Sequence, residues 1–270
     1  MFFSVDMEGI SGIVSWDQTS SRGYDYARAR KLMTEEVNAA VRGAVRAGAK
    51  ELLVNDSHNA MTNLLIEELQ SPARLLTGSP KPGSMMEGLD ATFDGVMLLG
   101  YHARMNARGV LSHTYSSRTV GCLWLNGQEA GELALNAYVA GHYDVPVLMV
   151  SGDNQLVGEA KALIADVTEV TVKETRSRYA AICLGAEDAR RVIEEGAYRA
   201  LIMKQRVRPV KIKRPVQLEV AFLHSGMAEA AEIMPGAIRT GGTSVAFQAP
   251  DILAAYKAFR TLVTLAGTVQ

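Results

Sequence analysis

Two acidic residues separated by one position, Asp6 and Glu8, directly follow a short apolar segment at residues 2–5. Side chains two positions apart in an extended strand point to the same face, so we expect these carboxylates to project together. Adjacent carboxylates disfavour each other's ionisation unless a cation lies between them. A divalent metal ion is one such cation. The alternative is a solvated acidic turn, which the following Gly9 and Gly12 would also suit.

Two of the five histidines, His58 and His102, also follow short apolar segments that are predicted to be strands. Because parallel strands end at one edge of a sheet, these imidazoles are expected to meet Asp6 and Glu8 there. Together with one further acid they form the oxygen and nitrogen ligand set that suits zinc or a similar ion. Each histidine alone also has a structural interpretation: His58 in a turn held by Asx-type hydrogen bonds, and His102 as a semi-buried, hydrogen-bonded side chain.

The further acid is not fixed by spacing. Glu129 and Glu132 both fall in the first turns of a helix predicted at residues 128–142, where the helix dipole favours any surface acid. His113 lies between Ser112 and Thr114, a pattern that fits a functional histidine and a core histidine with a hydroxyl partner equally well. Cysteine is absent from this ligand set, which favours a catalytic metal site with open positions over a closed structural one.

Composition places the chain among ordinary globular proteins. It has 270 residues, 48% hydrophobic and 21% charged, with a formal net charge of -1, which gives no sign of a nucleic-acid or membrane-surface partner. Two cysteines are too few for a disulfide framework. We see no apolar run of the ~20 residues that a membrane-spanning helix needs and no visible signal peptide, so a cytoplasmic location is expected.

Apolar segments and amphipathic segments alternate along the chain. This alternation predicts an α/β fold with a mainly parallel sheet and helices on both faces. The predicted strands are residues 2–5, 51–54, 96–99, 146–150 and 167–173, and the predicted helices are 24–47, 61–69, 128–142, 155–165 and 187–201. Residues 13–23 are predicted to be a polar loop, and 109–114 and 120–125 to be strands or extended loops.

A basic, proline-containing segment at residues 204–215 marks a change of composition. No aromatic residues are interleaved with its charges, so we interpret it as a solvated linker and not as a nucleic-acid patch. A second strand-helix-strand-helix pattern follows it. We therefore expect a metal-binding catalytic domain at residues 1–205 and a smaller C-terminal α/β domain at 206–270.

Five ordered motifs resemble the DppA-type D-aminopeptidases, a family of zinc metallopeptidases. The resemblance extends along nearly the whole chain, including residues 143–147 and 247–249. The motifs are residues 4–9 (SVDMEG), 55–58 (NDSH), 100–103 (GYHA), 112–113 (SH) and 131–133 (GEL). Residues 14–23 depart from the family pattern and leave the substrate preference open.

The resemblance implies two zinc ions per subunit. Asp6 matches the family's bridging carboxylate, and His113 matches a histidine proposed to be catalytic. It also selects Glu132 over Glu129, and it implies an α/β domain with a smaller C-terminal domain and a ring-shaped homo-oligomer, a decamer with an internal channel. The remaining metal ligands that it implies are Glu8, His58, His102 and Glu132.

The expected activity is hydrolysis of short peptides with an N-terminal D-amino acid, such as D-Ala-D-Ala, by a water activated between two metals. The D-configuration follows from the resemblance alone. His113 would donate a proton to the leaving amine or a hydrogen bond to the oxyanion; a nucleophilic role is less economical. Two alternatives stay open: a metal-dependent hydrolase of other amides, including L-peptides, or of phosphate esters, and a non-catalytic, metal-stabilised assembly protein.

Overall fold

A seven-stranded sheet forms the centre of the larger part of the molecule in the computed structural model, which describes residues 1–269. Its strand order is β3-β2-β1-β4-β7-β8-β9, and all neighbours are parallel except β9, which runs antiparallel to β8. Apolar side chains from β1, β4 and β7 are buried completely or almost completely at its centre. The strands are β1 (Phe2–Val5), β2 (Leu52–Asp56), β3 (Ala73–Leu76), β4 (Val96–Tyr101), β7 (Val147–Asp153), β8 (Thr168–Ser177) and β9 (Ala180–Cys183).

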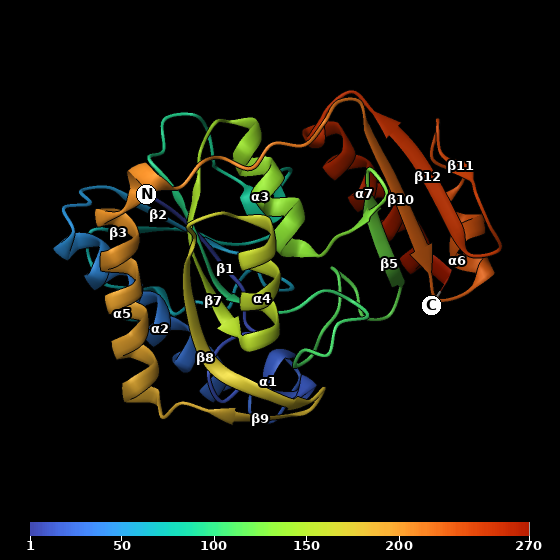
Figure 1. Ribbon diagram of the computed structural model, residues 1–270. Coiled ribbons are helices and arrows are strands. Elements are labelled where there is room, and N and C mark those ends of the chain that lie inside the picture. Colours follow the sequence, from blue (N-terminus) through green and yellow to red (C-terminus); the bar gives the residue numbers. More distant parts are fainter. Residues whose placement is uncertain (270) are drawn as a thin grey trace.

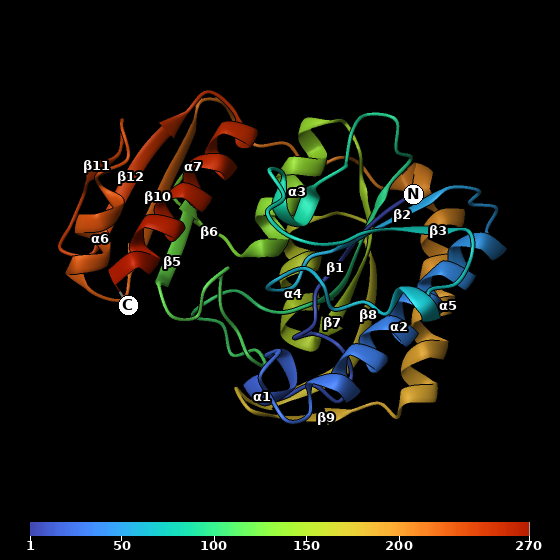
Figure 2. The same ribbon diagram turned by 180° about the vertical axis from the view of Figure 1, so that it is seen from behind.

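Helices cover both faces of this sheet (Figures 1 and 2). α2 (Tyr26–Arg46) and α5 (Ala186–Ile202) pack together on one face, and α3 (Glu132–His142) and α4 (Asn154–Leu163) lie on the other. The apolar stripe of α2 points inward because its members recur every three or four residues. The predicted α/β class with helices on both faces is confirmed.

The order of the strands determines where a site can form. β1 lies between β2 and β4, so the chain leaves β1 toward one side and later returns to the other. Val5, the last residue of β1, pairs with Asp56 of β2 and Leu99 of β4. The carboxyl ends of these three strands therefore lie side by side at a topological switch point, where open α/β sheets bind ligands.

A second, five-stranded antiparallel sheet lies beside the first domain, at the right of Figure 1. Its order is β11-β12-β10-β5-β6, and α6 (Ser225–Ala231) and α7 (Ile252–Ala266) pack on it. Two of its strands come from residues 120–129, so the C-terminal segment does not form this sheet alone. The division at residues 205 and 206 stays a prediction. The strands are β5 (Val120–Leu125), β6 (Gln128–Glu129), β10 (Val216–Phe222), β11 (Ile238–Arg239) and β12 (Ser244–Ala249).

The C-terminal helix is more apolar than we expected. Residues 252–269 are long and apolar enough to span a membrane by length and composition alone, contrary to the expectation that no segment approaches this limit. In the fold, α7 packs against β10 and β12, and it buries Ala255, Phe259 and Leu262 on one stripe. Its apolar composition is therefore used in the core of the second sheet.

The helix predicted at residues 61–69 is wrong, because a side chain outside this segment determines the path of its backbone. Residues 61–69 contain only a short 3-10 helix (Ile66–Glu68), because the Asp56 carboxylate accepts hydrogen bonds from the backbone N–H groups of Asn63 and Leu64. Of the two alternatives for residues 109–114, a strand or an extended loop, the structure has a loop, with Leu111 at a positive φ of 51°.

Two further segments differ from their predictions. Residues 128–142 begin as strand β6, because the turn at residues 126–127 pairs β6 with β5, and the helix starts only at Glu132. Residues 13–23 contain the short helix α1 (Trp16–Thr19), whose N-terminus is capped by Ser15 and Gln18 in a capping box. Strands β3, β9 and β11 were not predicted.

Candidate metal centre

The structure brings all six predicted site residues together at the carboxyl ends of β1, β2 and β4. His58 Nδ1 lies 3.1 Å from Asp6 Oδ1 and 3.0 Å from Glu8 Oε2. The other Asp6 oxygen, Oδ2, lies 3.5 Å from His102 Nε2. Glu132 Oε1 approaches the same His102 nitrogen at 3.4 Å. Asp6 therefore stands between two halves of the cluster, with one oxygen directed to each.

The three imidazoles of the cluster share one arrangement. His58 Nε2 faces the Thr19 carbonyl at 2.8 Å, His102 Nδ1 the Ala103 carbonyl at 3.0 Å, and His113 Nδ1 the Leu111 carbonyl at 2.9 Å. A carbonyl oxygen only accepts, so each of these nitrogens carries a hydrogen. The second nitrogen of each ring is left to face the carboxylates. Metal-binding histidines are oriented in the same way.

The donor atoms fit a pair of metal ions. They fall into two groups, Asp6 with Glu8 and His58, and His102 with His113 and Glu132, and within each group they lie within 4.8 Å of one another. Every one of these side chains is at most 11% exposed. Buried His102 Nε2 makes no hydrogen bond to any residue of the described chain. Such a nitrogen, aimed at two carboxylates, is suited to bind a cation.

Burial and mutual charge shift the pKa values of the cluster in opposite directions. Burial, together with the Glu8 charge, raises the pKa of Asp6 to about 8. Burial and the neighbouring His102 charge lower the pKa of His113 to about 4. Burial opposes protonation of His102 as well, but Glu132 and Asp6 outweigh it and raise its pKa to about 10. The site thus concentrates more negative charge than its burial tolerates without compensating cations.

Residues that are not metal ligands fix the loops that carry the ligands. Lys173 Nζ donates to the carbonyls of Ile10 at 3.0 Å and Ile13 at 2.6 Å, and also to that of Glu8. A Cβ at Gly9 would lie 1.9 Å from the Tyr101 carbonyl oxygen, so only glycine permits the close turn after Glu8. On the next strand, the Asp56 carboxylate accepts from the N–H groups of Asn63 and Leu64, seven and eight residues later, so it does not form an Asx-type turn around His58, and the His58 ring joins the cluster.

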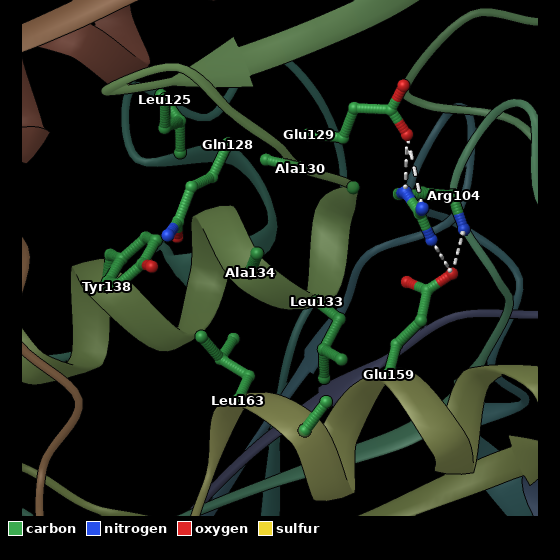
Figure 3. A pocket seen from close by; sticks show the side chains of 12 residues that line it. Arg104, Leu125, Gln128, Glu129, Ala130, Leu133, Ala134, Tyr138, Glu159 and Leu163 are labelled. Atoms are coloured by element: carbon green, nitrogen blue, oxygen red, sulfur yellow. Dashed lines mark hydrogen bonds and ion pairs between the residues drawn. The ribbon is translucent and has the colours of Figure 1, made fainter.

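The structure separates the two candidate glutamates. Glu132 begins α3 and lies in the cluster, where Oε1 also accepts from the Tyr115 N–H at 2.6 Å. Glu129 lies on β6 and pairs with Arg104 at 3.1 Å, while a second Arg104 nitrogen binds Glu159 at 2.9 Å (Figure 3). That side holds a separate cavity of about 220 Å³, which none of the six cluster residues lines.

A larger cavity of about 790 Å³ opens above the cluster. Trp16 of α1 lies in its wall and meets the His113 ring edge-on, with 5.5 Å between ring centroids. Residues that we did not predict line the rest, including Thr19, Tyr115, Arg118 and Arg260. Arg260 belongs to α7, and no local signal in the sequence indicates which face of that helix meets a ligand.

The family model of the D-aminopeptidases matches residues 1–261. The chain belongs to the D-aminopeptidase family. Among its relatives is the D-aminopeptidase of Bacillus subtilis, 47% identical over 268 residues that cover 98% of this chain and 97% of the relative.

A solved structure agrees with this assignment. It is described as the zinc-dependent D-aminopeptidase DppA from Bacillus subtilis, a self-compartmentalizing protease. It superposes with a TM-score of 0.96 at 46% identity, covering 98% of this chain and 97% of that one. The D-aminopeptidase fold thus includes both sheets of the present chain.

Proposed function

We propose that this chain is a zinc-dependent aminopeptidase that hydrolyses short peptides with an N-terminal D-amino acid, such as D-Ala-D-Ala. One observation carries the proposal: two groups of metal donors, joined by Asp6, form the floor of a peptide-sized cavity. The identity of 47% to a D-aminopeptidase supports the substrate class. Cavities of several hundred Å³ are typical of small-molecule sites.

We assign the metal ligands from the geometry of the cluster. Glu8 and His58 would hold one ion, His102 and Glu132 the other, and Asp6 would bridge them through its two oxygens. Zinc bound there would supply Lewis acidity, which polarises a carbonyl and lowers the pKa of water to about 7. The donor set of carboxylates and imidazoles without cysteine is the one that catalytic zinc sites use.

His113 is proposed to move a proton. Its Nδ1 hydrogen is engaged by the Leu111 carbonyl, so Nε2 carries the lone pair and faces the cluster, 4.0 Å from Glu132 Oε1. This nitrogen would accept a proton from the water that attacks the peptide carbonyl and pass it to the leaving amine as the C–N bond breaks. The His102 ring, stacked at 4.1 Å, and the edge of Trp16 restrict its orientation.

We also propose that the chain forms a homo-oligomer, in the expected case a decamer, since its relative is described as self-compartmentalizing. Large apolar side chains are exposed on the β8–β9 hairpin, where Tyr179 is 56% and Ile182 55% exposed. Others are exposed beside the second sheet, where Ile233 in the turn after α6 is 73% and Ile238 of β11 is 67% exposed. Such patches are typical of contact surfaces. The expected cytoplasmic location stays a prediction.

The proposal is tested by metal analysis of the purified protein with a release assay on D-Ala-D-Ala, L-Ala-L-Ala and a phosphodiester. Two zinc ions per chain and turnover of the D-peptide alone are expected. Preferential cleavage of the L-peptide or the phosphodiester would identify a different metal-dependent hydrolase. Full activity in verifiably metal-free protein would refute the metal assignment.

A further inference from the structure

Two arginines, Arg118 and Arg260, line the large cavity and are its only lysine or arginine side chains among the described residues. The cavity's acidic groups, Asp6, Glu8 and Glu132, all lie in the metal cluster. Neither arginine forms an ion pair with a carboxylate anywhere in residues 1–269, whereas Arg42, Arg104 and Arg190 do. The cavity therefore has an anionic, metal-binding floor and an uncompensated cationic wall.

Hydrogen bonds to the backbone fix the guanidinium of Arg260. Its Nη1 donates to the carbonyls of Lys81 at 2.8 Å and Pro82 at 2.9 Å. These neutral acceptors fix the guanidinium without cancelling its charge. Nε and Nη2, on the adjacent edge, make no hydrogen bond within the described chain. Two parallel N–H groups on one edge match the two oxygens of a carboxylate.

The helix that carries Arg260 presents one stripe to the cavity. Arg260, Val263 and Thr264 line the wall at positions i, i+3 and i+4. Phe259 and Leu262 of the same helix are buried, and α7 packs against the second sheet. The second sheet thus contributes a preformed side of the substrate cavity, opposite in charge to the metal cluster.

We propose that Arg260 binds the free C-terminal carboxylate of the peptide substrate, with Arg118 adding positive charge. This inference rests on the proposed function and names its substrate class: short peptides with a free acid at the C-terminus. A short peptide carries a C-terminal carboxylate whatever its side chains are. The cationic wall would bind this carboxylate while the N-terminal end of the peptide lies at the metal cluster. Peptides with an amidated C-terminus would lack it.

The test compares kcat/KM for D-Ala-D-Ala and for D-Ala-D-Ala amide. Wild-type protein is expected to prefer the free acid by about tenfold or more, the range of a charge-assisted hydrogen bond. Arg260→Met should reduce this ratio toward one, because hydrolysis of the acid falls much more than that of the amide. Lys257→Met, which removes an exposed charge one turn earlier on α7, is the matched control and should keep the ratio.

The outcomes separate the two proposals. Equal cleavage of acid and amide by the wild type would overturn the carboxylate subsite and leave the aminopeptidase activity standing, whereas cleavage of neither would count against that activity. An equal loss on both substrates in Arg260→Met would show a merely structural role, through the backbone of residues 81–82. If that variant does not fold, Arg260→Lys is the second test. It keeps the positive charge but loses the pair of parallel N–H groups, so it should lower the acid-to-amide ratio of kcat/KM in part. A C-terminally amidated peptide with an acidic second side chain should not recover the preference; recovery would mean that the site binds side-chain carboxylates.

Discussion

At the scale of single residues, the chemistry depends on how each imidazole divides its two nitrogens. One nitrogen of His58, His102 and His113 is committed to a backbone carbonyl, and the other faces acid side chains. His113 is distinguished by distance: its Nε2 lies 4.0 Å from the nearest carboxylate oxygen, while His58 Nδ1 and His102 Nε2 lie 3.0 to 3.5 Å from carboxylate oxygens. This difference supports a catalytic role for His113 and a ligand role for the others.

Replacement of His113 tests that distinction. His113→Ala is expected to reduce kcat by roughly 10²–10⁴, the usual contribution of a general acid-base group, while two metal ions stay bound. Metal content would be measured on the same preparation used for kinetics. A parallel fall in bound metal would make His113 a ligand, as its grouping with His102 and Glu132 permits.

Glu129 of β6 and Glu132 of α3 form a matched pair for substitution. Glu132→Gln removes a carboxylate from the cluster and is expected to lower zinc stoichiometry toward one per chain and to abolish turnover. Glu129→Gln, which only breaks the pair with Arg104, should keep both metals and most activity. Metal analysis of both variants decides the matter. Loss of metal from the Glu129 variant alone would reverse our assignment.

At the scale of elements, buried charges hold the ligand-bearing turns. Lys173 lies on β8, is 1% exposed and reaches three carbonyls in residues 8–13. Glu36 of α2 accepts from the Ser11 N–H at 2.9 Å in the same turn. The geometry of Glu8 is therefore set by two elements that contribute no ligand.

Lys173→Met is expected to destabilise the fold. The methionine side chain keeps the apolar packing of the lysine stem, but three buried carbonyls lose their hydrogen-bond donor. The expected loss is about 3 kcal/mol or more, measured as unfolding free energy or as a lower Tm. Lys161→Met, at a 74% exposed side chain, should change stability by less than about 0.5 kcal/mol. A Lys173 variant as stable as the wild type would show that water replaces the ammonium.

Glu36 gives the fold a predictable pH dependence. Burial raises the pKa of its carboxyl from 4.5 to about 7. The folded state therefore holds this proton more tightly than the unfolded chain, and the resulting stability is complete below about pH 4.5 and is lost as pH rises through about 7. Glu36→Gln keeps the acceptor for Ser11 and cannot ionise.

Thermal unfolding of both proteins between about pH 5 and pH 8 measures the effect. The wild type should lose about 2–3 kcal/mol of stability over this range relative to Glu36→Gln. Parallel curves for the two proteins would contradict the assignment of this pH dependence to Glu36.

At the scale of the whole molecule, the metal cluster lies at one edge of a core that is complete without it. Both sheets bury continuous apolar surfaces, and the cluster joins β1, β2, β4 and α3 only at their ends. We therefore expect a chelator to abolish turnover while the chain stays folded at room temperature, with a lower Tm because bound metal stabilises the native state.

Activity, circular dichroism and light scattering on one chelated sample check this expectation. Restoration of activity by added zinc is the control. Unfolding together with metal loss would support the structural-metal alternative, in which the ions only hold an assembly together. A scattering mass ten times that of the chain would support the decamer, and any other multiple would revise it.

Local features of the fold and the site could be predicted from the amino-acid sequence alone. Short apolar runs predicted the strands of the parallel sheet, and polar residues at their exits predicted where Asp6, His58 and His102 would lie, because strand ends in a parallel sheet share an edge. The periodic stripe of α2 likewise predicted its buried face. The family resemblance added the selection of Glu132, which spacing left open.

Features that depend on partners distant in the chain could not be predicted locally and follow from the packing of the folded chain. β5 joins the second sheet because it pairs with β10, which lies some ninety residues later. β6 pairs in turn with β5, and this pairing delays the start of α3 until Glu132. Arg260 reaches the cavity because the buried side of α7 is fixed by packing against β10 and β12. Local periodicity shows that a helix has an apolar face, but only the packed neighbours determine what its other face meets.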